Sequence, residues 1–429
     1  MNYKKTITAF KVFILFVLLH GCSTTPNNNG GNNTTTVPVS PSNLTGNSVS
    51  LTQVDLSWID NSTNETGFKI ERRLNGGTFY VVGTVGENVY NYSDQTVTPR
   101  TIYTYRVYSY NAVGNSPTYS NEFTIQTGST PIIVTLNAMG IGSNTLVSGG
   151  NVSDSGLGPV TEKGIVWNTT PGPTIVLSTQ TQDGSGNGSY LSHVSGLLPN
   201  TTYYIRAYAR NNYGTGYGNE ITINTPPLLT DIDGNQYPTF IENCSGKLWT
   251  QTNLNVSRYR NGDPIPQVIA NNPCPTCPEI PVLSTGFWCW RFYGNQTDSS
   301  LKFYNNNAVT DSRGLAPQGW HVATTSDWKK LIKCIDPNSD TTISTNSFDE
   351  YPIIEAGISH WPSPNNLSTN TSGFTALPSG YFYYQTGWGI GEASYWTDIA
   401  GYIKLPPGYY HFGTAPSVSQ ARSVRLVKD

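Results

Sequence analysis

Residues 101–108 read TIYTYRVY, and residues 201–208, one hundred positions later, read TTYYIRAY. The residues that follow recur with the same offset, since Asn111 corresponds to Asn211. A period near one hundred residues is too long for a solenoid unit. It suits two consecutive β-sandwich domains, each of roughly one hundred residues.

Apolar and polar side chains alternate within the repeats. Val54, Leu56 and Trp58 are separated by polar residues, and residues 103–107 follow a similar pattern. Successive side chains of a strand point to opposite faces, so each apolar set would cover one face of a sheet. Neither repeat contains a cysteine, so we expect two all-β sandwiches without an inter-sheet disulfide.

The composition excludes several classes of protein. Only 12% of the 429 residues are charged and the formal net charge is -3, whereas a nucleic-acid binder would show a basic face or stripe. Aromatic residues make up 12%, which is too many for a disordered chain. Gly, Pro, Asn and Ser are abundant, which favours turn-rich β structure. We therefore expect a multidomain β-rich protein with no nucleic-acid partner.

The N-terminal residues resemble the signal of a bacterial lipoprotein. The apolar run at residues 12–19 would span about 12 Å as a helix, far less than the ~30 Å hydrocarbon core. Residues 1–21 are therefore interpreted as a signal peptide. The motif Leu19-His20-Gly21-Cys22 resembles a lipobox, which implies lipid attachment to Cys22 and cleavage before it. The alternative is an ordinary secretory signal followed by a disulfide cysteine.

The lipobox resemblance also predicts a location. Ser23 follows Cys22, and by this resemblance the outer membrane is favoured over the inner one. Residues 22–37 are polar and predict a flexible tether with about 20 Å of reach. We expect a surface-exposed envelope protein whose membrane contact is the lipid on Cys22.

The two repeats resemble known modules. Residues 38–127, with Trp58 in an early strand, resemble a fibronectin type III domain, which implies an immunoglobulin-like sandwich with Tyr103 or Tyr105 at its tyrosine corner. Residues 130–226 contain VTEKGIVW and resemble a variant common in surface proteins of the Bacteroidetes. A spacer role is favoured over ligand binding by the loop tips.

The composition changes after Pro226-Pro227, which ends the second repeat. Trp328, Leu331 and Ile332 lie at i, i+3 and i+4, which predicts a helix, and a Ser or Thr just before this run is a suitable N-cap. The remainder reads as short strands and polar loops. An α+β domain is therefore expected in the C-terminal half.

Residues 228–429 resemble the Fibrobacter succinogenes major paralogous domain. The resemblance is carried, in this order, by DIDGNQY (231–237), YRNGDPIP (259–266), PQGWHV (317–322), SGFTALPSGY (372–381) and SVR (423–425). That family in turn resembles the C-type-lectin-like and formylglycine-generating-enzyme-like fold. The family usually has cysteines in place of Ala316 and Leu426, and both are absent here, whereas Cys289 stands at a family position.

The remaining cysteines favour structural bonds over chemistry. Cys274-Pro275-Thr276-Cys277 is a CxxC motif, but it lies among prolines and no helical pattern follows it. A zinc site would need a second ligand pair at short spacing. An exported chain favours disulfides, and no cofactor or metal is expected. The sequence does not fix the pairing among Cys244, Cys274, Cys277, Cys289 and Cys334.

No catalytic motif stands out. The chain has no Gly-x-Ser-x-Gly elbow, HExxH helix or P-loop. A formylglycine-type oxidase is excluded because no cysteine follows Cys334, and His321 is interpreted as structural. The segment 231–235 resembles part of a calcium loop, but a hairpin turn at Asp233-Gly234 is the favoured interpretation. A glycosidase needs two carboxylates, for which the sequence offers Asp263, Asp311, Glu355, Glu392 and Asp398.

Aromatic residues are the remaining functional signal. Trp320, Trp328 and Trp396 are expected in the core. Trp361, Trp388, Tyr381 and Tyr383 are the predicted ligand-binding residues. The favoured function is non-enzymatic capture of an extracellular glycan or another polymer, including a protein ligand, in adhesion or substrate capture. The alternatives are an exported enzyme or accessory protein of polysaccharide breakdown, and a purely structural envelope protein.

Overall fold

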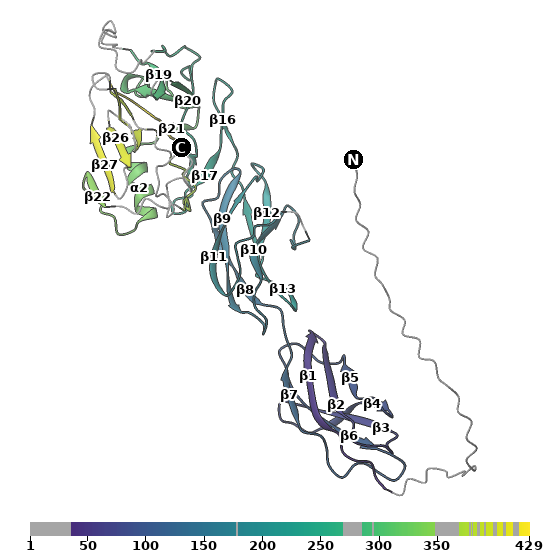
Figure 1. Ribbon diagram of the computed structural model, residues 1–429. Helices are drawn as coiled ribbons and strands as arrows, with labels where there is room; N and C mark the ends of the chain where they lie inside the picture. Colours follow the sequence, from purple (N-terminus) through teal and green to yellow (C-terminus); the bar gives the residue numbers. More distant parts are fainter. Residues whose placement is uncertain are drawn as a thin grey trace, which may run out of the picture. The chain divides into compact units, whose positions relative to one another are not determined.

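The computed structural model consists mainly of β-strands (Figure 1). It describes residues 36–176, 179–268, 285–293, 296–347, 369–376, 379, 381–383, 387–389, 392–397, 401–405, 409–414 and 420–429. The chain divides into two compact units, which consist mainly of residues 36–125 and residues 126–429. None of the helices in the described part is long and apolar enough to cross a membrane.

The first unit is a sandwich of a three-stranded and a four-stranded sheet. The three-stranded sheet has the order β1 (Ser42–Ser50), β2 (Gln53–Ile59), β5 (Asn91–Asp94). The four-stranded sheet has the order β4 (Tyr80–Gly86), β3 (Gly67–Leu74), β6 (Ile102–Tyr110), β7 (Phe123–Gln126). This arrangement agrees with the sandwich that the resemblance to fibronectin type III domains implied.

The alternation of apolar residues fills the core of this sandwich. Val54 and Leu56 of β2 are buried, and so are Phe68 and Ile70 of β3. The ring centroids of Trp58 and Phe68, which belong to different sheets, are 5.6 Å apart. The period-two pattern of β2 is therefore confirmed as the inward face of a sheet.

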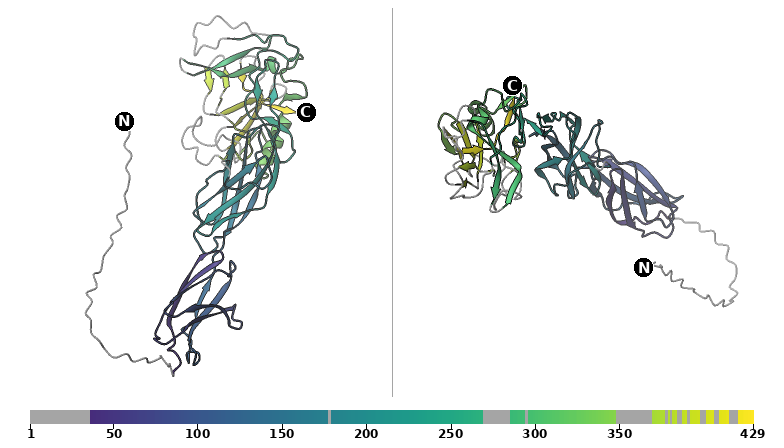
Figure 2. Two further views of the ribbon diagram at one scale, coloured as in Figure 1. Left: turned by 90° about the vertical axis from the view of Figure 1, so that its right-hand side faces the viewer. Right: turned by 90° about the horizontal axis from the view of Figure 1, so that it is seen from above.

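A second sandwich follows at the start of the second unit. One of its sheets has the order β11 (Gly188–Ser195), β9 (Thr145–Asp154), β8 (Ile132–Met139). The other has the order β10 (Glu162–Asn168), β12 (Thr202–Asn211), β13 (Gly214–Tyr217), with β14 (Ile221–Asn224) also paired to β12. Buried residues of both sheets form one core, and Figure 2 shows these strands in teal from two further sides.

The two sandwiches repeat each other in detail. Strands β6 and β12 occupy the two stretches with which the sequence repeat begins. The side-chain oxygen of Asn111 accepts hydrogen bonds from the N–H groups of residues 113 and 114. Asn211 does the same with residues 213 and 214. In the second sandwich the Tyr203 hydroxyl accepts the N–H of Leu198 at 3.0 Å, which is the contact of a tyrosine corner.

The described residues of the C-terminal part form short strands in four sheets and two helices. A two-stranded sheet joins β15 (Leu229–Thr230) and β16 (Gln236–Tyr237). One larger sheet has the order β17 (Thr239–Ile241), β18 (Leu248–Thr250), β29 (Leu426–Lys428), β21 (Trp320–Val322). The second has the order β19 (Trp288–Tyr293), β20 (Gln296–Asn305), β28 (Gln420–Arg422), β23 (Tyr381–Tyr383), β24 (Gly387–Gly389). The third has the order β22 (Thr345–Ser347), β27 (Tyr409–Thr414), β26 (Gly401–Leu405), β25 (Ala393–Trp396). The helices are α1 (Asn306–Val309) and α2 (Thr325–Ile335).

The predicted helix is α2. Thr324 is its N-cap, and the Thr324 and Asp327 side chains form a capping box. Trp328, Leu331 and Ile332 are buried in one core together with Trp249, Phe374 and Tyr395. Trp320 and Trp396 are buried as well, as expected.

The second sandwich is hydrogen-bonded to the C-terminal part within the same unit. Gly142 and Phe240 form an isolated antiparallel β-bridge. The Ser143 hydroxyl, which is fully buried, accepts the N–H of Thr239 at 2.8 Å. A Cβ on Gly140 would lie 2.6 Å from the carbonyl oxygen of Thr371, so only glycine fits there. Close backbone contacts therefore join the second sandwich to the domain that follows it.

Candidate functional site

Arg422 of β28 lies at the centre of a group of aromatic and charged side chains. The strand register places it opposite Tyr381 of β23. Its guanidinium carbon is 3.9 Å from the ring centroid of Tyr402 and 5.0 Å from the ring centroids of Tyr381 and Trp396. We call Tyr381, Glu392, Tyr402, Lys404 and Arg422 the Arg422 cluster.

The Arg422 side chain is buried among aromatic rings. Only 2% of the residue is exposed, and its Nη1 donates a hydrogen bond to Gln420 at 2.8 Å. Among the described residues, no group accepts a hydrogen bond from its Nε and no carboxylate forms an ion pair with it. Burial lowers the pKa of Arg422 to about 10, so the guanidinium is still charged at neutral pH. The surrounding rings stabilise this charge through cation–π contacts.

An ion pair lies next to these rings. Lys404 Nζ is 2.7 Å from Glu392 Oε1 and 4.0 Å from the ring centroid of Tyr381. The Lys404 and Glu392 side chains are 21% and 17% exposed. Tyr381 and Tyr402 are partly exposed too. The cluster therefore presents aromatic surface and charged hydrogen-bonding groups side by side.

A glycine makes room for one of the rings. Tyr402 of β26 pairs with Gly413 of β27. A Cβ on Gly413 would lie 2.4 Å from the Tyr402 ring. The Tyr402 ring therefore lies over Arg422 only because strand β27 has no side chain at this position.

The structure brings one predicted ligand-binding residue, Tyr381, into the cluster. The register pairs Tyr383 with Gln420 and with Gly387. It pairs Trp388 with Phe382, so Trp388 lies between Gly387 and Gly389, the residues that pair with Tyr383 and Tyr381. Trp361 and Cys22, the predicted site of lipidation, lie outside the described residues, as do Cys274 and Cys277.

The comparisons with known proteins concern parts of the chain. Residues 243–428 match the family model described as the Fibrobacter succinogenes major domain. These residues form a Fibrobacter succinogenes major domain. They contain all members of the Arg422 cluster, which therefore lies within this domain.

Other similarities are more limited. Over 90 residues the chain is 38% identical to an amylopullulanase of Thermoanaerobacterium saccharolyticum. These residues make up 21% of this chain and 7% of that protein. The chain therefore spans only a small part of the length of this curated relative. A crystal structure of the FN1-FN3 domains of chicken CNTN1 has 21% identity and a TM-score of 0.26, covering 44% of this chain and 68% of that one. A structure titled "Myokine structure" has 20% identity and a TM-score of 0.19, covering 21% and 97%.

Other aromatic residues of the Fibrobacter succinogenes major domain surround its own cations. Lys302 Nζ lies 4.4 Å from the ring centroid of Trp288 and 5.2 Å from that of Trp290. Arg425 is fully buried, and its guanidinium carbon is 4.4 Å from the ring centroid of Phe374. Sequence reasoning missed these cations, since no spacing rule marks a Lys or Arg as buried when its partners are rings far away in the chain.

In the described part of the chain, the carboxylates considered for a glycosidase site form ion pairs with Arg or Lys side chains. Arg313 bonds Asp311 at 2.8 Å and Asp263 at 3.2 Å. The hydrogen bonds from Arg313 lower the pKa of Asp311 to about 2, and bonds from Asn261 and Arg313 lower that of Asp263. A glycosidase acid needs a raised pKa, so neither carboxyl suits that role. Glu392 is paired with Lys404, while Glu355 and Asp398 lie outside the described residues.

The segment 231–235 forms the favoured hairpin turn, which joins β15 to β16. Asp231 Oδ1 accepts the N–H groups of Asp233 and Asn235, each at 2.9 Å. Its Oδ2 accepts hydrogen bonds from the Asn235 amide and the Tyr237 hydroxyl. Hydrogen-bond donors therefore occupy both carboxylate oxygens, which explains the turn without calcium.

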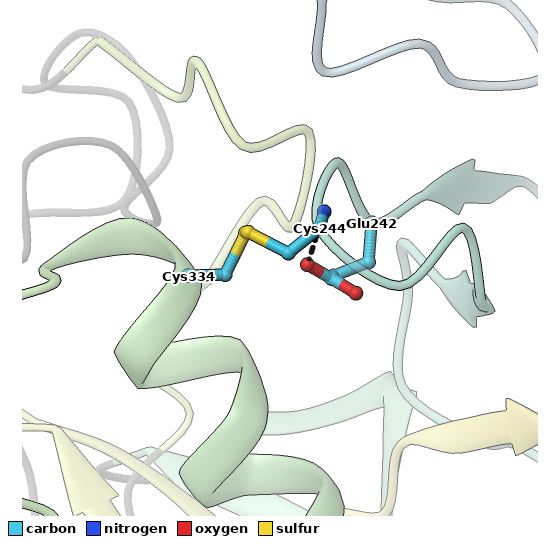
Figure 3. Close-up of side chains that lie close together, drawn as sticks. All are labelled: Glu242, Cys244 and Cys334. Carbon is cyan, nitrogen blue, oxygen red and sulfur yellow. Dashed lines mark hydrogen bonds between the residues drawn. A yellow bond between two sulfur atoms is a disulfide. The ribbon is translucent and has the colours of Figure 1, made fainter.

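Glu242, Cys244 and Cys334 bring possible metal-ligand atoms within 4.8 Å of one another (Figure 3). The two cysteines, however, form a disulfide. The Glu242 carboxylate accepts the N–H groups of Cys244 at 2.7 Å and Ser245 at 2.8 Å. The disulfide and these hydrogen bonds therefore explain the three residues as a turn fixed by a structural disulfide. Cys289 is buried and is a free thiol, and burial raises its pKa to about 12.

Proposed function

We propose that the protein captures an extracellular polysaccharide, without catalysis, through the Arg422 cluster of its C-terminal domain. The observation that carries this proposal is the position of two partly exposed tyrosines beside the Lys404–Glu392 ion pair. A lectin-like fold of this domain and a spacer role for the sandwiches belong to the same proposal.

The chemistry of the cluster suits a sugar. The C–H faces of a sugar ring pack on aromatic rings, while its hydroxyls exchange hydrogen bonds with charged and amide groups. Tyr381 and Tyr402 supply the aromatic surface, and Lys404, Glu392 and Gln420 supply the polar groups. Binding sites in general combine an apolar surface with a few placed polar groups. The partial similarity to an amylopullulanase supports a role with polysaccharides.

Two features favour binding over hydrolysis. Asp263 and Asp311 share Arg313 and have lowered pKa values, whereas an acid catalyst must hold its proton near neutral pH. Glu392 is likewise engaged in an ion pair, with Lys404 Nζ 2.7 Å from its Oε1. A capture protein needs neither group as an acid.

The proposed location follows from the N-terminal motif. A lipid on Cys22 would hold the protein in the outer membrane, and the polar tether would let the domains reach outward. Labelling with a fatty acid tests this proposal. Wild type should take up the label and Cys22→Ala should not, whereas an unlabelled wild type would contradict the anchor.

Affinity electrophoresis of the full chain in gels that contain pullulan, amylose or xylan tests the binding site. Wild type should be retarded by at least one polymer, and Tyr381→Ala or Glu392→Gln should weaken that binding by about tenfold, which is 1.4 kcal/mol. Tyr409→Ala is the matched control, since Tyr409 is 43% exposed on β27 outside the cluster. Equal loss in the control, or none in the cluster variants, would refute the site. Release of reducing sugar by wild type would favour the enzyme alternative.

A further inference from the structure

A cavity lies between the second sandwich and the C-terminal domain, inside the second compact unit. Its volume is about 360 Å³, and small-ligand sites commonly measure roughly 300–1,000 Å³. Residues of β9 and β11 line one side, and residues of the segments 251–252 and 370–375 line the other. Ligand sites often lie between domains, and none of the described lining residues belongs to the Arg422 cluster. The cavity is therefore a candidate for a second, separate site.

The sandwich side of the cavity is the outward face of a sheet. The register pairs His193 of β11 with Val147 of β9, and Ser195 with Thr145. Val194, which lies between His193 and Ser195 along the strand, is buried in the core of the sandwich. Successive side chains of a strand alternate between the two faces. His193 and Ser195 therefore point away from this core, toward the cavity that they line.

The opposite side is a loop whose conformation is fixed by hydrogen bonds. Thr375 has a φ of 57°, which lies in the left-handed region that β-branched residues rarely adopt. Asn370 accepts the N–H of Thr375 and donates to its hydroxyl, each at 2.9 Å. Arg425 Nη2 donates to the carbonyl oxygen of Thr375, also at 2.9 Å. Residues in such conformations persist where their surroundings hold them, and they are common at ligand sites.

The two sides are joined by a buried glutamine. The side-chain amide of Gln251 donates to the carbonyl oxygen of Gly373 at 3.0 Å and to the Thr145 hydroxyl at 3.3 Å. Gln251 is only 6% exposed. The cavity is therefore bounded by hydrogen-bonded contacts, so its shape exists before any ligand enters.

The groups that remain open in the cavity are polar. The side chains of Asn144, His193 and Thr252 are exposed, and no hydrogen bond within the described part of the chain engages them. The described lining contains no Lys, Arg, Asp or Glu. A charged ligand would lose water without gaining a counter-charge, which is costly. A wholly apolar ligand would leave the amide, imidazole and hydroxyl groups unpaired.

We infer that this cavity binds a small neutral sugar of roughly one or two rings. Each sugar hydroxyl can donate and accept a hydrogen bond, which matches the amide of Asn144, the imidazole of His193 and the hydroxyl of Thr252. Val147 and Pro238 supply apolar surface for the C–H groups of the ring. A bound sugar would contact the sandwich and the C-terminal domain together.

Saturation-transfer difference NMR of the full chain with glucose, xylose and maltose, each at about 10 mM, tests this inference. At least one sugar should bind to wild type, with a dissociation constant on the order of 1 mM. His193→Ala and Asn144→Ala should each weaken this binding by about fivefold, because each removes one hydrogen-bonding group. Both residues are exposed, so the urea unfolding midpoint should not change. Leu191→Ala is the matched control, since Leu191 is 42% exposed on the same face of β11 outside the cavity.

The outcomes separate this site from the Arg422 cluster. Wild type that binds a small sugar through His193, but is not retarded by any polysaccharide, would support the cavity and contradict the function proposed for the cluster. Binding that is lost in Tyr381→Ala and kept in His193→Ala would place the sugar at the cluster and overturn the inference. Absence of binding of all three sugars to wild type, or equal loss in Leu191→Ala and His193→Ala, would overturn it as well.

Discussion

The Sγ atoms of Cys244 and Cys334 are bonded to each other, which ties the turn after β17 to the last turn of α2 (Figure 3). Helix α2 contributes Trp328 to a core that also contains Trp249 of β18. The disulfide therefore fastens the helix to the sheet against which its apolar face packs.

Removal of this bond should destabilise the C-terminal domain. The two cysteines are 90 residues apart, and closing a loop of this size raises the free energy of the unfolded chain by about 4.6 kcal/mol through lost conformational entropy. Measured effects are commonly smaller, so we expect the Cys244→Ser, Cys334→Ser double variant to lose about 2–4 kcal/mol in urea unfolding. The difference between wild type and variant should vanish in dithiothreitol, and its persistence there would show that the serines, not the missing bond, cause it.

Arg425 should be one of the least replaceable residues of the domain. Its Nε donates to Asn253, its Nη1 to the carbonyl oxygens of Thr250 and Phe374, and its Nη2 to that of Thr375. Arg425→Lys keeps a charge but loses the planar fork, so several buried oxygens lose their donors. We expect a loss of about 3 kcal/mol or more in urea unfolding, against less than about 1 kcal/mol for the Lys428→Arg control at an exposed position. Equal effects of the two variants would show that the hydrogen bonds of Arg425 do not have this importance for stability.

The sequence predicts the repeated architecture well, because its signals are local. Alternating residues of β2, the equivalent turns at Asn111 and Asn211, and the N-cap of α2 depend on neighbours within a few positions. The hairpin turn at residues 231–235 is predicted correctly for the same reason.

The site is harder to predict because its partners are far apart in the chain. The sequence indicates Tyr381 but not its neighbours Lys404 and Arg422, since only the pairing of β23 with β28 and of β25 with β26 brings them together. The pairing of Cys244 with Cys334 likewise depends on the packing of α2.

Gly413→Ala should disturb the Arg422 cluster without replacing any of its members. The new methyl group would lie 2.4 Å from the Tyr402 ring, so the ring must move away from Arg422. Overpacking of this kind costs about 1–3 kcal/mol, and we expect weaker polysaccharide binding as well. Gly86→Ala is the control, because a Cβ on this strand glycine meets nothing within 4 Å. Unchanged stability and binding in Gly413→Ala would show that the Tyr402 position is not required.

The stability of the C-terminal domain should fall in acid partly because of Asp327. Burial by itself raises the pKa of Asp327, but hydrogen bonds from Thr324, His321 and Lys247 outweigh burial and hold the pKa well below its usual value. A carboxyl with a lowered pKa in the folded state stabilises the fold above the unfolded pKa of about 4. This contribution is lost progressively as the pH falls below about 4, when the unfolded chain takes up the proton more readily.

Asp327→Asn isolates this contribution. The variant should be about 1–3 kcal/mol less stable than wild type in urea at pH 7, because the amide cannot accept all the bonds that Thr324, His321 and Lys247 donate. The difference should shrink at pH 3 and below, where wild type loses the same contribution. Asp336→Asn is the matched control, since Asp336 follows the other end of α2 and accepts the N–H of Asn338 at 3.0 Å. The stability difference between Asp327→Asn and wild type could instead stay constant from pH 7 to pH 2. That result would mean that the carboxylate charge contributes nothing and that only the shape of the capping box matters.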